Sequence, residues 1–280
     1  MLGNYGLKPR HIVTLLFILL ALVLSLAPII LGIAASLSSP AETVVYPPRL
    51  LPSELSHEHY STVFGNGLWL SLRVSLVYAS VTVIFALLLG SITAYGLDRF
   101  RFGGRGLVLF VILSGIPLAT GAAALIVPTY RLATWVGLTD TVAVLPIVYV
   151  AYTLPLVAWV LKAAMETVPQ ELDEAATVDG AGPLRILFSV VLPVMKPAIG
   201  AAALFAFVGA WNEFISGSVL VDSPLLRPIQ VAVYQNIGFF GRDWGPLLAS
   251  GVVAILPIVI VFIFFGRLMI RGLTGGALKG

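Results

Sequence analysis

The chain has 280 residues, of which 59% are hydrophobic and 10% are charged, and its formal net charge is +3. Its mean hydropathy is +1.03. Because soluble domains carry roughly 25% charged residues, this composition excludes a water-soluble globule and predicts an integral membrane protein. Cysteine is absent, which excludes disulfide bonds and thiolate metal sites.

Six apolar stretches are long enough to cross a membrane, for which a helix needs about 20 residues. Five contain no charged residue, and the sixth, 197–221, is interrupted only by Glu213. The stretches lack the alternation of barrel strands, so helices are expected. We predict an all-α fold with one transmembrane domain, 1–280, in which the spans lie at about 12–37, 68–97, 107–129, 141–163, 198–221 and 246–270.

The first stretch is longer than the apolar region of a signal peptide, so we expect it to remain as a membrane anchor.

Basic residues in the connections predict the orientation. With the N-terminus inside, the inner segments contain Lys8, Arg10, Arg99, Arg101, Arg105, Lys162, Arg185, Lys196, Arg267, Arg271 and Lys279. The outer segments contain Arg49, Arg131, Arg227 and Arg242. This bias predicts a multi-pass cell-membrane protein with both termini in the cytoplasm.

The inner connection at 164–197 has the pattern of two short helices with a break between them. Pro169 suits a first helical turn, Gly180 and Gly182 supply the turn, and Pro183 begins the second helix. An apolar stripe at helical spacing is expected in the second helix, formed by Leu184, Leu187, Phe188 and Val191. In the first helix, Ala175 and Ala176 are expected to be exposed beside acidic residues, which suits docking into a groove on another protein.

The same connection resembles the EAA loop of binding-protein-dependent permeases of ATP-binding-cassette (ABC) transporters. EAA at 174–176, G at 180 and VVLP at 190–193 fit the pattern EAA-x3-G-x9-I-x-L-P, with Val190 in place of Ile as the one departure. The resemblance implies an ABC type I importer permease whose coupling helix docks into a separate ATPase subunit. The residues implied in that coupling are Glu174, Ala175, Ala176, Asp179 and Gly180.

Other segments resemble the carbohydrate-uptake branch of these permeases. They are YPPRLLP at 46–52, DRFRFGGR at 98–105, AWNEF at 210–214, DWGPLLAS at 243–250 and RGLTGGALKG at 271–280. Together they look like the second permease subunit of a maltose- or trehalose-type importer. At 70–72 the chain has Leu-Ser-Leu where relatives usually carry Asn-Ser-Leu, so no role of that Asn is carried over. The implied partners are another permease subunit, an ATPase dimer and an extracytoplasmic sugar-binding protein.

No ATP-binding or metal-binding pattern is present in the sequence. Without a G-x-x-x-x-G-K-[ST] motif the chain cannot cradle nucleotide phosphates. ATP and magnesium are therefore expected on the partner ATPase, with no cofactor or metal on this chain. His11, His57 and His59 are expected to be solvated. The chain is expected to be a non-enzymatic half of a heterodimeric pore.

Two charged residues, Arg73 and Glu213, lie within predicted spans, where charge is costly and usually functional. Their similar depth predicts a structural pair in which each neutralises the other. In the alternative, Asn212 and Glu213 line the sugar path while Trp211 or Phe214 stacks on sugar faces. Trp211 could also pack between helices.

The resemblance implies two further contacts. The third outer loop would enter the binding protein through Ile237, Gly238, Phe239 and Phe240. The alternative is that the two phenylalanines anchor the loop at the membrane interface. The cytoplasmic tail, 271–280, would reach the ATPase dimer through Gly276, Lys279 and Gly280.

Two alternative functions stay open, and the identity of the sugar is also undetermined. The chain could be an ABC permease for another solute, such as glycerol phosphate or a peptide. An anionic solute would require unpaired basic groups along its path, for example Arg73. A stand-alone secondary transporter would require coupling-ion residues near the midplane and usually an internal repeat, and the sequence shows no repeat.

Overall fold

The computed structural model describes residues 9–43, 45, 51–120, 122–238, 241–242 and 244–277. Apart from one short hairpin, the regular structure in these residues is helical, as expected. The chain divides into two compact units, Met1–Gly67 with Gln235–Val253 and Leu68–Tyr234 with Ala254–Gly280. Each unit has its own packing and is described in turn.

The first unit contains a long apolar helix, several short elements and the first part of a second long helix. Its elements are α1 (Pro9–Ser36), α2 (Pro40–Thr43), α3 (Glu58–Gly65), the antiparallel strands β1 (Ile237–Gly238) and β2 (Gly241–Arg242), and the first part of α14 (Trp244–Ala277). The hydroxyl groups of Ser36 and Tyr60 share a hydrogen bond of 2.8 Å, which joins the end of α1 to α3. No residue of an 18-residue apolar window within Ile12–Ser36 of α1 is buried within the chain, so its aliphatic side chains are free to face lipid or another subunit.

His59 is buried, which corrects the expectation that it is solvated. Only 3% of the residue is exposed, and its Nε2 has no hydrogen-bond partner among the described residues. The imidazole ring lies directly against the backbone of Gly245, where any Cβ would overlap it. The imidazole ring of His59 in α3 thus packs against the start of α14, and this close approach requires glycine at 245.

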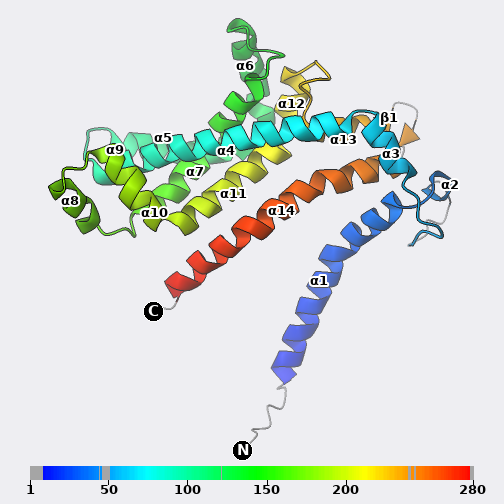
Figure 1. Ribbon diagram of the computed structural model, residues 1–280, viewed down its shortest axis with the longest axis horizontal. Helices are drawn as coiled ribbons and strands as arrows, with labels where there is room; N and C mark the ends of the chain where they lie inside the picture. The colour runs from blue at the N-terminus through cyan, green and yellow to red at the C-terminus, as the bar shows by residue number, and fades with distance from the viewer. Residues whose placement is uncertain are drawn as a thin grey trace, which may run out of the picture. The chain divides into compact units, whose positions relative to one another are not determined.

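The second unit is a bundle of long helices with a group of short helices at one end (Figure 1). α4 (Leu68–Arg99) packs against α7 (Val144–Met165) and α11 (Lys196–Asn212), and α5 (Arg105–Thr120) packs against α7. Small residues allow these helices to approach closely, as is usual where helices associate in a membrane. Ala86 in α4 and Ala202 and Ala206 in α11 are fully buried.

Four described helices are long and apolar enough to cross a membrane. They are Ile12–Ser36, Leu68–Arg99, Val144–Met165 and Trp244–Gly266, which overlap the stretches predicted as the first, second, fourth and sixth spans. A fifth is obtained if Pro183–Val194 and Lys196–Asn212, which meet at a bend of 91°, are counted as one. The count of six spans stays a prediction.

The fifth predicted span is built from more than one helix. In the stretch 107–129 the described residues belong to α5 and α6 (Ala122–Trp135), and residue 121 between them lies outside the described residues. In 198–221, α11 ends at Asn212 and α12 (Ile215–Leu220) follows after two non-helical residues. Irregular backbone at membrane depth is tolerated where it lines a cavity or is buried in protein, so the break after α11 indicates a site.

Candidate functional site

The predicted break in the inner connection is confirmed. α8 (Glu171–Val178) ends before Gly180, whose φ of +80° is a left-handed conformation that favours glycine. α9 (Pro183–Ile186) then begins with proline in its first turn, as expected. Figure 1 shows α8 and α9 together at one end of the second unit's bundle.

α8 carries the EAA residues on a largely exposed surface. The helix has no buried residue, and Glu174, Ala175, Asp179 and Gly180 are all exposed. Ala176 differs from the expectation, because it is half-buried and packs against the core of the second unit. Within the EAA sequence, Ala176 therefore faces the core of the second unit, whereas Glu174 and Ala175 are exposed.

The second helix of the loop does not form the continuous apolar stripe that its spacing predicts. Leu187 and Val191 are fully buried, but Leu184 and Phe188 are exposed. The physical reason is a π-helical segment, Leu187–Val191, that follows α9 and changes the number of residues per turn. The buried pair belongs to the core that fixes the base of the loop to α4 and α7.

Arg99 is a residue of this site that the sequence analysis placed only among the basic residues of the inner segments. It ends α4, and its side chain is 7% exposed. Its guanidinium forms salt bridges of 2.6 Å with Asp98 and 2.8 Å with Asp173 of α8. The charged pair Asp98-Arg99 at the end of an apolar stretch was the available signal, but its contact with Asp173 requires the tertiary structure.

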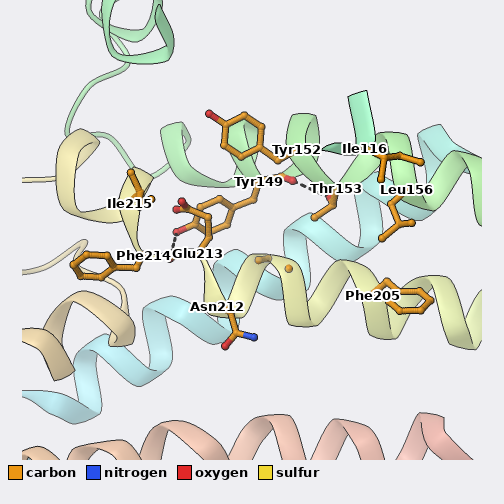
Figure 2. A pocket seen from close by; sticks show the side chains of 12 residues that line it. Ile116, Tyr149, Tyr152, Thr153, Leu156, Phe205, Asn212, Glu213, Phe214 and Ile215 are labelled. Atoms are coloured by element: carbon orange, nitrogen blue, oxygen red, sulfur yellow. Dashed lines mark hydrogen bonds between the residues drawn. The ribbon is translucent and has the colours of Figure 1, made fainter. Parts of the chain in front are cut away.

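A cavity of about 510 Å³ lies beside the break after α11. Figure 2 shows the side chains that surround it. They come from α5, α7, α11 and the start of α12: Ile116, Tyr149, Tyr152, Thr153, Leu156, Phe205, Gly209, Ala210, Asn212, Glu213, Phe214 and Ile215. The lining combines aromatic and aliphatic faces with a few hydroxyl, amide and carboxylate groups, which is the usual composition of a small-molecule site.

Three of the four predicted path residues line this cavity, namely Asn212, Glu213 and Phe214. Trp211 does not line it. Trp211 is 2% exposed, and its ring stacks on Phe207 with centroids 5.4 Å apart. Its indole N–H donates to the backbone carbonyl of Ala254. The alternative of helix packing is therefore the one that the structure supports for Trp211.

The expected ion pair between Arg73 and Glu213 is absent, although both residues are described. Both carboxylate oxygens of Glu213 accept the backbone N–H of Ser216, at 3.0 and 2.9 Å. The guanidinium of Arg73 is exposed and lies 5.6 Å from the ring centroid of Trp69, one turn earlier in α4. A similar depth in two helices does not bring two side chains together unless the helix faces that carry them also face each other. Here each charged group interacts with a residue close to it in the sequence.

The remaining predicted contacts are only partly within the described residues. Ile237 and Gly238 form β1, whereas Phe239 and Phe240 lie outside the described residues. In the predicted tail, 271–280, the described residues are helical, because α14 continues through Gly276 to Ala277. Lys279 and Gly280 also lie outside the described residues.

Comparison with known proteins agrees with this architecture. Residues 86–275 match the family described as binding-protein-dependent transport system inner membrane component. The chain is 33% identical to the maltodextrin transport system permease protein MdxG of Bacillus subtilis over 80% of both chains. It is 34% identical to the trehalose/maltose transport system permease protein MalG of Thermococcus litoralis over 75% of both chains.

A solved structure gives the same fold. One chain of a bacterial ABC transporter involved in the import of the acidic polysaccharide alginate matches with a TM-score of 0.79 and 24% identity, over 95% of this chain and 99% of that chain. The long apolar helices and the family match define a multi-pass membrane permease. The chain belongs to the family of binding-protein-dependent transport system inner membrane components, whose match covers more than half of its length.

Proposed function

We propose that this permease is one of the two pore-forming subunits of an ATP-driven sugar importer. A second permease subunit would complete the pore, and a separate ATPase dimer would bind ATP and magnesium. The observation that carries the proposal is the exposed α8 with its EAA spacing, because its alanine and acidic residues are accessible for docking into a groove on another protein. Relatives named for maltodextrin and for trehalose/maltose transport support sugar as the solute.

The cavity supports a neutral sugar better than an anionic solute. Glu213 is its charged lining residue, and none of the described residues that line it is basic. Tyr149, Tyr152 and Thr153 of α7 are polar lining residues, and Phe205 and Phe214 add aromatic side chains (Figure 2). A phosphate or carboxylate on the solute would meet the Glu213 carboxylate without a compensating cation, which is unfavourable at low dielectric.

Glycerol phosphate is the solute that this charge distribution disfavours most. Its transport would be expected to use an unpaired Arg73 along the path. Arg73 is not among the residues that line the cavity, and its guanidinium lies over Trp69. A stand-alone secondary transporter is disfavoured because the EAA loop would then have no role.

The outer and inner ends of the chain would contact different partners. The β1–β2 hairpin would enter an extracytoplasmic binding protein, with Ile237, Gly238, Phe239 and Phe240 as the contacts. The C-terminal segment with Gly276, Lys279 and Gly280 would reach the ATPase dimer. This arrangement requires both termini in the cytoplasm of a cell with an inner or cytoplasmic membrane.

Purification of the assembled complex tests the proposal. The solute retained by the co-purified binding protein would be identified by mass spectrometry. Proteoliposomes would then be tested for uptake of that solute with ATP enclosed. We expect a neutral sugar and strictly ATP-dependent uptake. A retained phosphate ester or peptide, or uptake that proceeds without ATP, would contradict the proposal.

A further inference from the structure

Arg99 holds the start of α8 from two sides. Besides the salt bridge to Asp173 within the helix, its Nη2 donates to the backbone carbonyl of Val168, which precedes the helix, at 3.0 Å. Its Nη1 donates to Asp98 at 2.6 Å. A planar guanidinium that donates in three directions fixes its own orientation and that of its acceptors.

α8 has little else to connect it with the spans. It has no buried residue, and it packs against the core of the second unit through the half-buried Ala176. α4, by contrast, is a 32-residue helix that packs along both α7 and α11. The Arg99 side chain is therefore a buried polar connection between the exposed α8 and the well-packed α4, next to Tyr95 of α4, which also interacts with Asp173.

We propose that Arg99 is a positioning residue that transmits displacement of α8 to α4. The inference rests on the proposed function, in which an ATPase subunit moves α8. Because the guanidinium contacts one acceptor before α8, the Val168 carbonyl, and one in its first turn, Asp173, a displacement of α8 would be passed to the end of α4 and not absorbed by rotation of α8 alone. Loss of the contact would leave α8 able to dock but loosely connected to the span.

Arg101 provides a matched control. It lies two residues further along the same inner turn, carries the same charge and is exposed. Arg99→Gln and Arg101→Gln remove the same charge from the same segment, but only the first removes the contact with Asp173 and Val168. Arg99→Lys keeps the charge and can reach one acceptor at a time.

The first experiment measures coupling in the complete transporter. ATP hydrolysis with and without sugar-loaded binding protein, and sugar taken up per ATP, would be measured in proteoliposomes. We expect Arg99→Gln to assemble, to keep basal hydrolysis and to lose about tenfold in stimulation and in sugar per ATP. Arg99→Lys should recover part of both, and Arg101→Gln should stay within about twofold of the unmodified complex. Equal losses in Arg99→Gln and Arg101→Gln would overturn the proposal.

A second measurement does not depend on the identity of the ATPase. Because the chain has no cysteine, Ile92→Cys on α4 and Val178→Cys on α8, both exposed, allow two spin labels to be placed on the permease. Arg99→Gln should broaden the distance distribution between them, and so should Asp173→Asn, which serves if Arg99→Gln fails to assemble. An unchanged distribution in both variants would overturn the role of Arg99 even if the importer function is correct. An unmodified complex without stimulated hydrolysis would instead contradict the importer function alone.

Discussion

The indole N–H of Trp211 donates a 3.0 Å hydrogen bond to the backbone carbonyl of Ala254. The bond joins the last turn of α11 to α14, and the ring is additionally stacked on Phe207. A tryptophan used in this way has neither a free face nor a free donor for a sugar. Trp211 thus holds the helix that ends beside the cavity, while the next three residues line it.

Substitution of Trp211 should change stability more than sugar recognition. Trp211→Phe keeps the aromatic packing but removes the N–H, and should lower the free energy of unfolding by about 1 kcal/mol. Trp211→Ala also removes the packing, with an expected loss of about 3–5 kcal/mol. Thermal unfolding in detergent measures both. A fall in sugar affinity of Trp211→Phe without a change in thermal stability would show that the indole contacts the solute.

Gly180 should tolerate asparagine but not valine. Its φ of +80° costs a non-glycine residue about 1–2 kcal/mol, and asparagine is among the residues that visit this region most readily. No atom lies within 4 Å of a Cβ built there, so backbone conformation alone distinguishes the variants. Gly180→Val should insert into the membrane but lose stimulated ATP hydrolysis, and Gly180→Asn should retain most of it. Similar hydrolysis in the two variants would contradict this role of the turn.

Local sequence signals predicted the elements that are determined locally. The uninterrupted apolar stretches predicted four long helices, and Gly180 with Pro183 predicted the break in the inner loop. The π-helical segment at Leu187–Val191 was missed, because i→i+5 hydrogen bonding has no distinct side-chain pattern. The break after Asn212 was also missed, because the single charged residue Glu213 interrupts the apolar stretch without marking the end of a helix.

Contacts between distant segments could not be predicted from one sequence. Arg73 and Glu213 have similar predicted depths, but the rotation of α4 about its axis decides what Arg73 faces. The same applies to Arg99 and Asp173, which are separated by 74 residues. Among the four candidates at 211–214, Trp211 faces α14, whereas the other three line the cavity. The sequence does not show which face of α11 lies beside the cavity, because that depends on how the helices pack.

Two substitutions of Glu213 should distinguish its structural role from the role of its charge. Glu213→Gln keeps an oxygen that can accept the Ser216 N–H and should preserve folding and neutral-sugar uptake. Glu213→Ala leaves that N–H in the second residue of α12 without its acceptor and should cost about 1–3 kcal/mol. The two variants are compared by thermal unfolding and by uptake of the retained sugar.

The charge of Glu213 can be read out separately by competition. An acidic oligosaccharide of the same length should inhibit ATP hydrolysis more strongly in Glu213→Gln than in the unmodified complex, since the repulsive carboxylate is gone. A loss of neutral-sugar uptake in Glu213→Gln as large as in Glu213→Ala would show that the carboxylate itself is needed.

Gly245 and His59 should behave as a coupled pair. A Cβ at 245 would overlap the imidazole ring, so Gly245→Ala must displace the ring or α3 and should cost about 1–3 kcal/mol. His59→Ala alone removes a buried ring whose Nε2 has no hydrogen-bond partner among the described residues, so its cost should come from lost packing.

In the double variant the new methyl group occupies part of the space that the ring leaves. The double variant should therefore be destabilised by less than the sum of the two single variants. A double-mutant cycle on thermal unfolding measures this difference, with Gly251→Ala in the same helix as the control, because nothing lies within 4 Å of a Cβ there. Strict additivity would show that His59 and Gly245 are not in contact in the folded protein.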